Sequence, residues 1–185
     1  MTDDELAALK RQVGELADRH AIRDCIMREC NGRDRQDEAM IASCWWEDGK
    51  DEHGAYIHLA PDYPARANAG HRSQFLMTSH NLTNHLCDLD GDTAHCQNYV
   101  MGALFWKDGK TTTLAMGRYL DRLEKRNGEW RLLVRRCTIE ATADCDASWI
   151  YSDAIKGFLR AKWDGSDPCY DTPYTAQPKE VGDRW

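Results

Sequence analysis

The stretch from Ala21 to Trp46, AIRDCIMRECNGRDRQDEAMIASCWW, decides the fold of this 185-residue chain. Its apolar residues recur at three- and four-residue spacings, which predicts two amphipathic helices with a short break at Asn31-Gly32. Asp34 lies at the joint between the two helices. Its carboxylate either caps the second helix or points into the space that the helices enclose.

Residues 3–30, which include the start of this stretch, are predicted to form one long helix or two helices in succession. Leu6, Leu9, Val13 and Leu16 repeat along it at intervals of three and four residues, as in a coiled coil. Such a stripe indicates packing, either on the rest of the domain or on a second subunit.

After this stretch, four long strands are predicted, and turns typical of hairpins separate them. The strands cover residues 79–89, 93–106, 111–125 and 129–141, and the turns contain Asp90-Gly91, Asp108-Gly109 and Asn127-Gly128. Long strands joined in this way predict an antiparallel meander, and helices followed by a meander define the α+β class. We therefore expect a curved sheet wrapped over the helices, with a pocket between them.

The remaining segments are shorter or less regular. We expect a turn over residues 47–51, a strand over 55–59, a loop over 60–70, a short helix over 72–78, a helix over 149–162 and a tail over 164–185.

Composition excludes several classes of function. The formal charge of −7 argues against nucleic acid as a partner, because phosphate binding needs a clustered positive surface. No apolar run approaches the roughly 20 residues of a membrane helix, and the acidic N-terminus does not resemble a signal peptide, so we expect a cytoplasmic protein without a membrane partner. The eight cysteines are expected to be free thiols, and without a C-x-x-C spacing a zinc site is not expected.

The candidate catalytic pair is an imidazole and a carboxylate. His80 begins the first meander strand, with Asn84 on the same face and His85 on the opposite face. If the His80 face is concave, the imidazole points toward Asp34, which would fix its tautomer and leave the other nitrogen as a general base. The alternatives are a packed or solvated histidine and an aspartate that only caps a helix.

Other polar residues fall on strand faces that would line the same pocket. Arg135 and Cys137 share a face of the fourth strand, and a buried arginine there needs an anionic partner. Tyr119 on the third strand either donates to a substrate oxygen or packs in the core. Glu29, before Asp34, is either a second acid or a solvated residue.

An ordered set of short motifs resembles the SnoaL-like branch of the nuclear transport factor 2-like superfamily over about residues 15–142. The motifs are Ala21-Ile22-Arg23-Asp24, Asp34, Trp45-Trp46, Thr78-Ser79-His80, Asp90-Gly91-Asp92, Gly117-Arg118-Tyr119 and Gly128-Glu129-Trp130-Arg131. The resemblance implies a cone of strongly bent antiparallel sheet around helices, with an apolar pocket. It predicts a domain over residues 1–145, and we expect the extension of residues 146–185 to pack on the domain or on a neighbouring subunit.

The resemblance also implies chemistry. Residues 34–48 are similar to hexachlorocyclohexane dehydrochlorinase, which, like scytalone dehydratase and bile-acid 7α-dehydratase, eliminates a group with an Asp–His pair and no cofactor. Carried over to this chain, the catalytic residues are Asp34, His80 and Arg135. Glu29 replaces a lysine or tyrosine of these relatives, which favours a hydroxyl over a halide as leaving group. The substrate-binding residues are then Glu29, Tyr119, Asn84 and Cys137.

We therefore expect a lyase, independent of metal or cofactor, acting on a hydrophobic hydroxylated aromatic compound. The family includes a lignin-derived diarylpropane formaldehyde lyase, and the aromatic residues of the C-terminal tail would cover a ligand such as a lignin-derived dimer. The alternatives are an isomerase that uses the same groups, a non-catalytic binding module and the small subunit of a ring-hydroxylating oxygenase. Members of the family are dimers or trimers, which predicts a homodimer or homotrimer.

Overall fold

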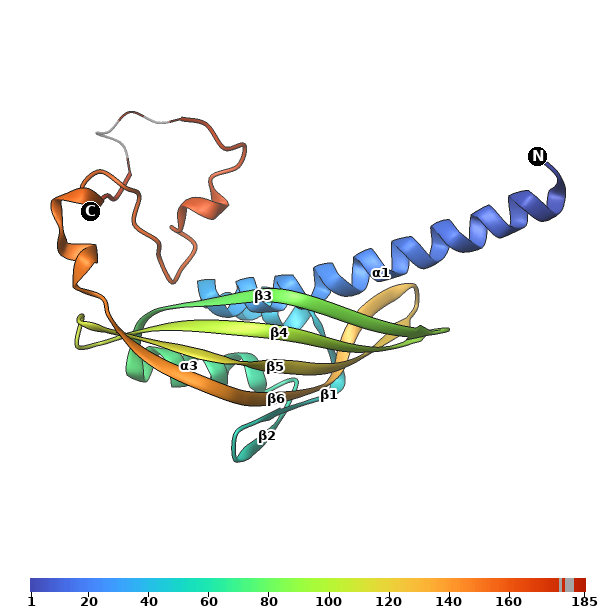
Figure 1. Ribbon diagram of the computed structural model, residues 1–185, viewed down its shortest axis with the longest axis horizontal. Helices are drawn as coiled ribbons and strands as arrows, with labels where there is room; N and C mark the ends of the chain where they lie inside the picture. The colour runs from blue at the N-terminus through green and yellow to red at the C-terminus, as the bar shows by residue number, and fades with distance from the viewer. Residues whose placement is uncertain (177, 179–181) are drawn as a thin grey trace.

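A computed structural model of the protein describes residues 1–176, 178 and 182–185, in which helices pack against a curved six-stranded sheet (Figure 1). The α+β class is confirmed. The elements are α1 (Asp3–Arg35), α2 (Glu38–Ser43), β1 (Trp45–His53), β2 (Tyr56–Leu59), α3 (Tyr63–Gln74), β3 (Phe75–Asp90), β4 (Thr93–Trp106), β5 (Thr111–Arg126) and β6 (Glu129–Asp146).

The sheet has the strand order β2-β1-β6-β5-β4-β3. The predicted meander β3-β4-β5-β6 is confirmed, and each of its three pairings is antiparallel. The sheet is mixed, however, because β1 runs parallel to β6. Strand β1 lies where a turn was expected, since the run Glu47-Asp48-Gly49-Lys50-Asp51 is typical of a turn and its pairing with β6 is not a local feature.

Helix α1 continues through the break that was expected at Asn31-Gly32 and ends at Arg35. Gly32 is buried, and a Cβ atom there would lie 2.9 Å from the side chain of Ile41 on α2. This glycine therefore lets the two helices approach closely. The chain turns one residue after α1, at Gln36, which has a left-handed φ of 56°.

The N-terminal half of α1 extends beyond the sheet, away from the other elements that the structure describes (Figure 1). Leu9, Val13 and Leu16 are 48%, 56% and 66% exposed. The prediction that this stripe packs on its own domain is therefore wrong, whereas packing on a second subunit stays a prediction. No described helix is long and apolar enough to cross a bilayer.

The segment before β3 differs from both predictions made for it, a loop over residues 60–70 and a short helix over residues 72–78. The expected loop over residues 60–70 is mostly helix α3, which begins at Tyr63 with Pro64 in its first turn, where a missing N–H is tolerated. The short helix expected over residues 72–78 ends at Gln74 instead, and β3 starts at Phe75.

The helix expected over residues 149–162 is also wrong. The chain there forms short 3-10 turns at Ser148–Tyr151 and Asp153–Ile155, and Gly157 has a φ of 88°, outside the helical range. The segment after β6 contacts the end of α1, since Arg35 pairs with Asp167 at 2.9 Å. The predicted division into residues 1–145 and 146–185 stays a prediction, and part of the tail lies outside the described residues.

The core lies where α1 and α2 meet the inner faces of β5 and β6. Ile22, Ile26 and Ile41 of the helices are completely buried, as are Leu123 and Leu132 of the strands. One end of this core is apolar, and the other end, toward the last turn of α1, is lined by charged and polar residues that form the candidate site.

Candidate active site

Asp34 lies in the last turn of α1 and receives three hydrogen bonds from β3. The backbone N–H of His80 donates to Oδ2 at 2.6 Å, the Thr78 hydroxyl donates to Oδ1 at 3.0 Å, and His80 Nδ1 lies 2.6 Å from Oδ1. The cap of α2 is Asp37, whose carboxylate accepts from the N–H of Met40. Of the two interpretations of Asp34, the geometry therefore matches the one in which it points inward.

The surroundings set the charges of this pair. Burial favours the protonated form of Asp34, but hydrogen bonds from His80 and Thr78 outweigh it and lower the pKa of Asp34. Burial and the nearby Arg33 guanidinium lower the pKa of His80, against the opposite effect of Asp34. A neutral imidazole beside a carboxylate holds its proton on Nδ1, where it donates to Asp34, and leaves a lone pair on Nε2.

The His80 side chain is only 5% exposed, yet it borders a pocket. Its Nε2 makes no hydrogen bond to any residue that the structure describes, and His71 stacks on its ring with centroids 5.7 Å apart. The pocket has a volume of about 510 Å³ and is lined by Met27, Arg28, Cys30, Asn31, Asp34, Arg35, Met40, Ser79, His80 and Leu82. A general base with a free lone pair therefore borders a space that can hold a small ligand.

Arg135 is completely buried and lies between two carboxylates. Its Nε and Nη2 donate to Asp121 at 2.7 and 3.0 Å, and its Nη1 donates to Glu29. Glu29 is also completely buried and accepts from the Tyr63 hydroxyl at 3.1 Å. The anionic partner that a buried Arg135 requires is thus present twice, and the solvated alternative for Glu29 is wrong.

Glu29 is ionised in this setting. Burial acts to raise its pKa, but the guanidinium groups of Arg135 and Arg33 outweigh it and lower the pKa of Glu29. Burial raises the pKa of Asp121, despite its contact with Arg135. An acid that donates a proton needs a raised pKa, so the Glu29 carboxylate does not match the predicted role of a second acid.

Tyr119 and Arg33 form a second polar group beside the pair. Arg33 Nη1 donates to the Tyr119 hydroxyl at 3.0 Å, and burial raises the pKa of Tyr119. Arg33 is 3% exposed, its Nε has no hydrogen-bond partner, and it forms no ion pair with any described residue. Burial acts to lower the pKa of Arg33, but Tyr119, Tyr63 and Glu29 outweigh it and raise that pKa, so the guanidinium stays charged and its unpartnered Nε can meet an anion or a developing negative charge.

Arg33 is not among the site residues predicted from the sequence. The signal was present, because Arg33 precedes Asp34 on the same last turn of α1, but its inward direction depends on the continuation of the helix through Gly32.

Several buried polar atoms of β1 and α3 have no hydrogen-bond partner among the described residues. They are Nε1 of Trp45, both carboxylate oxygens of Asp51, Nδ1 of His53, the side-chain amide of Asn68 and Nδ1 of His71. Nδ1 of His53 does lie 3.7 Å from Oδ2 of Asp51. Burial raises the pKa of Asp51 to about 6 and lowers the pKa of His53 and of His71 to about 3. Buried polar groups in native proteins bind ordered water when no protein group satisfies them.

These imidazoles predict acid sensitivity of the fold. Folded His53 and His71 stay neutral down to about pH 3, whereas the unfolded chain protonates them near 6.5, so the free energy of unfolding falls as pH drops through this interval. Asp51, with a raised pKa, opposes this loss between pH 6 and 3.8. In urea denaturation over about pH 7 to 4, His53→Gln is expected to lose stability less steeply than the wild type. The exposed His95→Gln serves as control, and equal slopes for His53→Gln and wild type would contradict the assignment.

Of the predicted substrate-binding residues, Asn84 points outward, whereas Cys137 is partly buried. A bulge between Leu82 and His85 reverses the alternation of β3, so that Asn84 is exposed and His85 faces inward. The prediction that Asn84 shares the face of His80 is therefore wrong. Cys137 is partly buried next to Tyr119, its partner in register across β5 and β6, and burial raises its pKa.

The fold and the site define a class of α+β protein in which helices and a curved sheet enclose a polar pair. Within this class, the chain belongs to the SnoaL-like domain family, because residues 14–136, more than half of the chain, match that family. The resemblance inferred from the sequence motifs is thereby confirmed.

Solved structures similar to this chain include enzymes and proteins of unknown function. Hexachlorocyclohexane dehydrochlorinase LinA type 2 is 23% identical, with 72% of this chain and 93% of that chain covered and a TM-score of 0.68. An NTF2-like protein with a cystatin-like fold from Novosphingobium aromaticivorans is 23% identical over 75% of this chain and 92% of that chain, with a TM-score of 0.64. A variant of Rv3472, a protein of unknown function from Mycobacterium tuberculosis, is 28% identical, with 71% of this chain and 75% of that chain covered and a TM-score of 0.60. No protein of curated function matches this chain.

Proposed function

We propose that this protein is a lyase that eliminates a small group from a hydrophobic hydroxylated substrate, with His80 as general base and no bound cofactor. The observation that carries the proposal is the hydrogen-bonded pair at 2.6 Å between His80 Nδ1 and Asp34, with Nε2 free beside a pocket. Neutral histidine held in one tautomer by a carboxylate is a common general base.

In the proposed reaction, His80 Nε2 takes a proton from a carbon next to the one that bears the leaving group. The electron pair of the broken C–H bond forms a C=C bond as the C–O bond breaks. The leaving oxygen takes the abstracted proton back from His80 Nε2, so that water leaves and the imidazole is neutral again. Asp34 holds the imidazole in place and stabilises its protonated form. Only side chains of this chain take part in the scheme.

Arg33 is the proposed stabiliser of negative charge on the substrate. It is a buried cation with an unpartnered Nε and without an ion pair among the described residues, next to a tyrosine hydroxyl that accepts from it. Because Tyr119 uses its oxygen to accept, its own hydrogen is available to a substrate oxygen. The donors of Arg135 are occupied by Glu29 and Asp121, so we assign Arg135 and Glu29 to positioning rather than to contact with the reacting atoms.

Two pockets support a hydrophobic substrate. The pocket at His80 adjoins a larger one of about 870 Å³, and both are lined by Arg35 and Ser79. The larger pocket lies between the sheet and the C-terminal segment, which contributes Trp149, Phe158 and Trp185. An aromatic substrate that reaches from one pocket to the other fits this lining, while the lignin-derived class and a homodimeric or homotrimeric state stay predictions.

Two observations favour a lyase over a non-catalytic binding module. Asp34 and His80 meet directly, and neither tryptophan of the pair Trp45-Trp46 lines the pocket beside them. Trp45 packs in the core at 3% exposure, and Trp46 donates its indole N–H to the backbone of Glu124. An isomerase would use the same base, and the products separate it from a lyase.

The test is product analysis with the full chain on two groups of compounds, hydroxylated aromatic carbonyl compounds and hexachlorocyclohexanes. Loss of water with formation of a conjugated product is expected from the first group. Because the pKa of His80 is lowered, kcat/KM should stay constant from neutral pH down to below 6.5 and fall only in more acidic solution. Chloride release without dehydration would contradict the hydroxyl leaving group. Rearrangement without loss of a group would show an isomerase, and turnover of neither group would contradict the lyase.

A further inference from the structure

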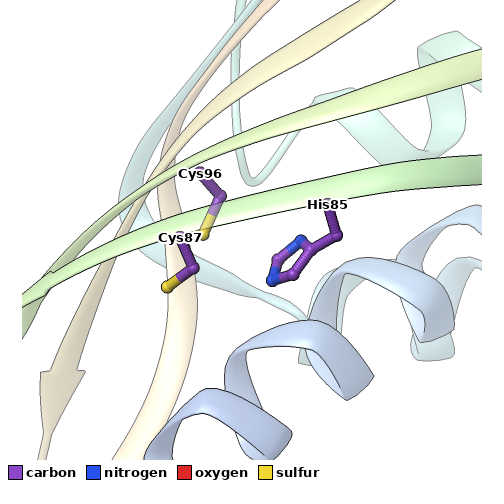
Figure 2. Close-up of side chains that lie close together, drawn as sticks. All are labelled: His85, Cys87 and Cys96. Carbon is purple, nitrogen blue, oxygen red and sulfur yellow. The ribbon is translucent and has the colours of Figure 1, made fainter.

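A cluster of one imidazole and two thiols lies between the β3-β4 hairpin and α1, as Figure 2 shows. His85 and Cys87 point to the same side of β3, and Cys96 is the direct partner of Cys87 across the hairpin. One ligand atom from each of the three residues lies within 4.8 Å of the others. The bulge in β3 that turns Asn84 outward is what turns His85 toward the sulfur atoms.

The hydrogen bonds around His85 fix which of its nitrogens is free. The amide of Asn98 donates to the Asp121 carboxylate at 3.1 Å, so the Asn98 oxygen faces His85 Nδ1 at 2.6 Å. Nδ1 therefore carries the hydrogen, and Nε2 keeps its lone pair. A histidine that binds a metal typically donates its other N–H to a carbonyl or carboxylate in this way.

We propose that His85, Cys87 and Cys96 form a binding site for a zinc ion, with a fourth position open to water. In a tetrahedral zinc site the ligand atoms lie about 3.3 to 3.8 Å from one another, so closing this cluster needs side-chain shifts of about 1 Å. Two thiolates and a neutral imidazole balance the charge of Zn²⁺, which makes the loaded site neutral overall. Imidazole and thiolate are also the ligands that zinc prefers.

The position of the cluster indicates a structural role for the metal. Cys96 is 5% exposed within the apolar core, whereas His85 and Cys87 are partly exposed, so an ion has a route in. The chain of contacts from His85 through Asn98 to Asp121 ends on Arg135. A bound zinc ion would therefore hold the hairpin and the positioning arginine in one network.

Spacing along the sequence did not reveal this site. His85 and Cys87 form an H-x-C pair, and Cys96 follows only across the turn at Gly91. The three meet because of the strand register, which brings Cys87 opposite Cys96.

The test is metal binding by the full, reduced chain. After incubation with Zn²⁺ and removal of the excess, one zinc ion per chain is expected by elemental analysis. Cys87→Ser, Cys96→Ser and His85→Gln should each retain much less zinc, while the exposed Cys145→Ser and His95→Gln should retain as much as the wild type. Loading with Co²⁺ should give a thiolate-to-cobalt charge-transfer band, together with intense visible bands of a tetrahedral site.

The wild-type cobalt spectrum keeps the proposal testable even where a cysteine variant fails to fold. Absence of zinc and of the charge-transfer band from the reduced wild type would overturn it. So would equal zinc retention in all folded variants, or a disulfide between Cys87 and Cys96 found by mass spectrometry in place of metal. These readouts do not depend on enzymatic turnover, so the zinc site and the proposed lyase activity can fail separately.

Discussion

Replacing His80 with glutamine is expected to lower kcat/KM for elimination by about 10²- to 10⁴-fold, the usual contribution of a positioned general base. The fold should persist, because Asp34 keeps its hydrogen bonds from the backbone N–H of residue 80 and from the Thr78 hydroxyl. The measurement is the initial rate of water loss, together with urea denaturation of the same variant.

The partner residue makes this prediction specific to the pair. Asp34→Asn removes the charge that stabilises the protonated imidazole, so its activity should fall by a similar factor. The double variant should be little worse than either single one, because groups that act as a unit show non-additive losses. Full additivity would mean that the two residues act independently.

Two controls come from the exposed face of α1, the helix that carries Asp34. His20→Gln and Asp24→Asn make the same chemical changes at residues that are exposed. Both should retain the activity of the wild type. Activity of folded His80→Gln at the level of these controls would remove the general base from the mechanism.

The parts of the structure that the sequence predicts are those determined by local pattern. Three Gly-containing turns define the meander, and the alternation of β5 correctly places Tyr119 on an inward face. Strand β1 and helix α3 depend on non-local pairing and on a proline in the first turn of a helix, so local composition gave a turn and a loop instead.

In the candidate site, too, local pattern was sufficient for some features, whereas others depend on the surrounding structure. The motifs around Asp34 and His80 were sufficient to predict that the two residues meet. Bulges cannot be read from alternation, and the one after Leu82 exchanges the faces of Asn84 and His85. The inward direction of Arg33 likewise required a helix that continues through Gly32, which the sequence presented as a break.

The largest expected effect on stability comes from Arg135. Arg135→Met leaves Glu29 and Asp121 as buried carboxylates without their cation, and breaking a buried pair in this way typically costs about 3 to 5 kcal/mol of unfolding free energy. Urea denaturation at neutral pH measures this loss. Adding Glu29→Gln and Asp121→Asn to the same chain should recover part of it, since the amides are no longer charged.

The neighbouring arginine provides the matched control. Arg136 pairs with Glu52 on the surface, and Arg136→Met should leave the free energy of unfolding nearly unchanged. Equal losses for Arg135→Met and Arg136→Met would show that the buried network contributes nothing specific.

Arg33→Met is expected to lose less stability than Arg135→Met. Arg33 forms no ion pair among the described residues. Burial disfavours its charge, but Tyr119, Tyr63 and Glu29 outweigh burial and raise the pKa of Arg33, so removal of the guanidinium should still cost some unfolding free energy. The elimination rate should fall, because the negative charge that develops on the substrate loses its buried cation. A variant that unfolds like Arg135→Met would make Arg33 a structural residue, and a stable variant with full activity would remove it from the site.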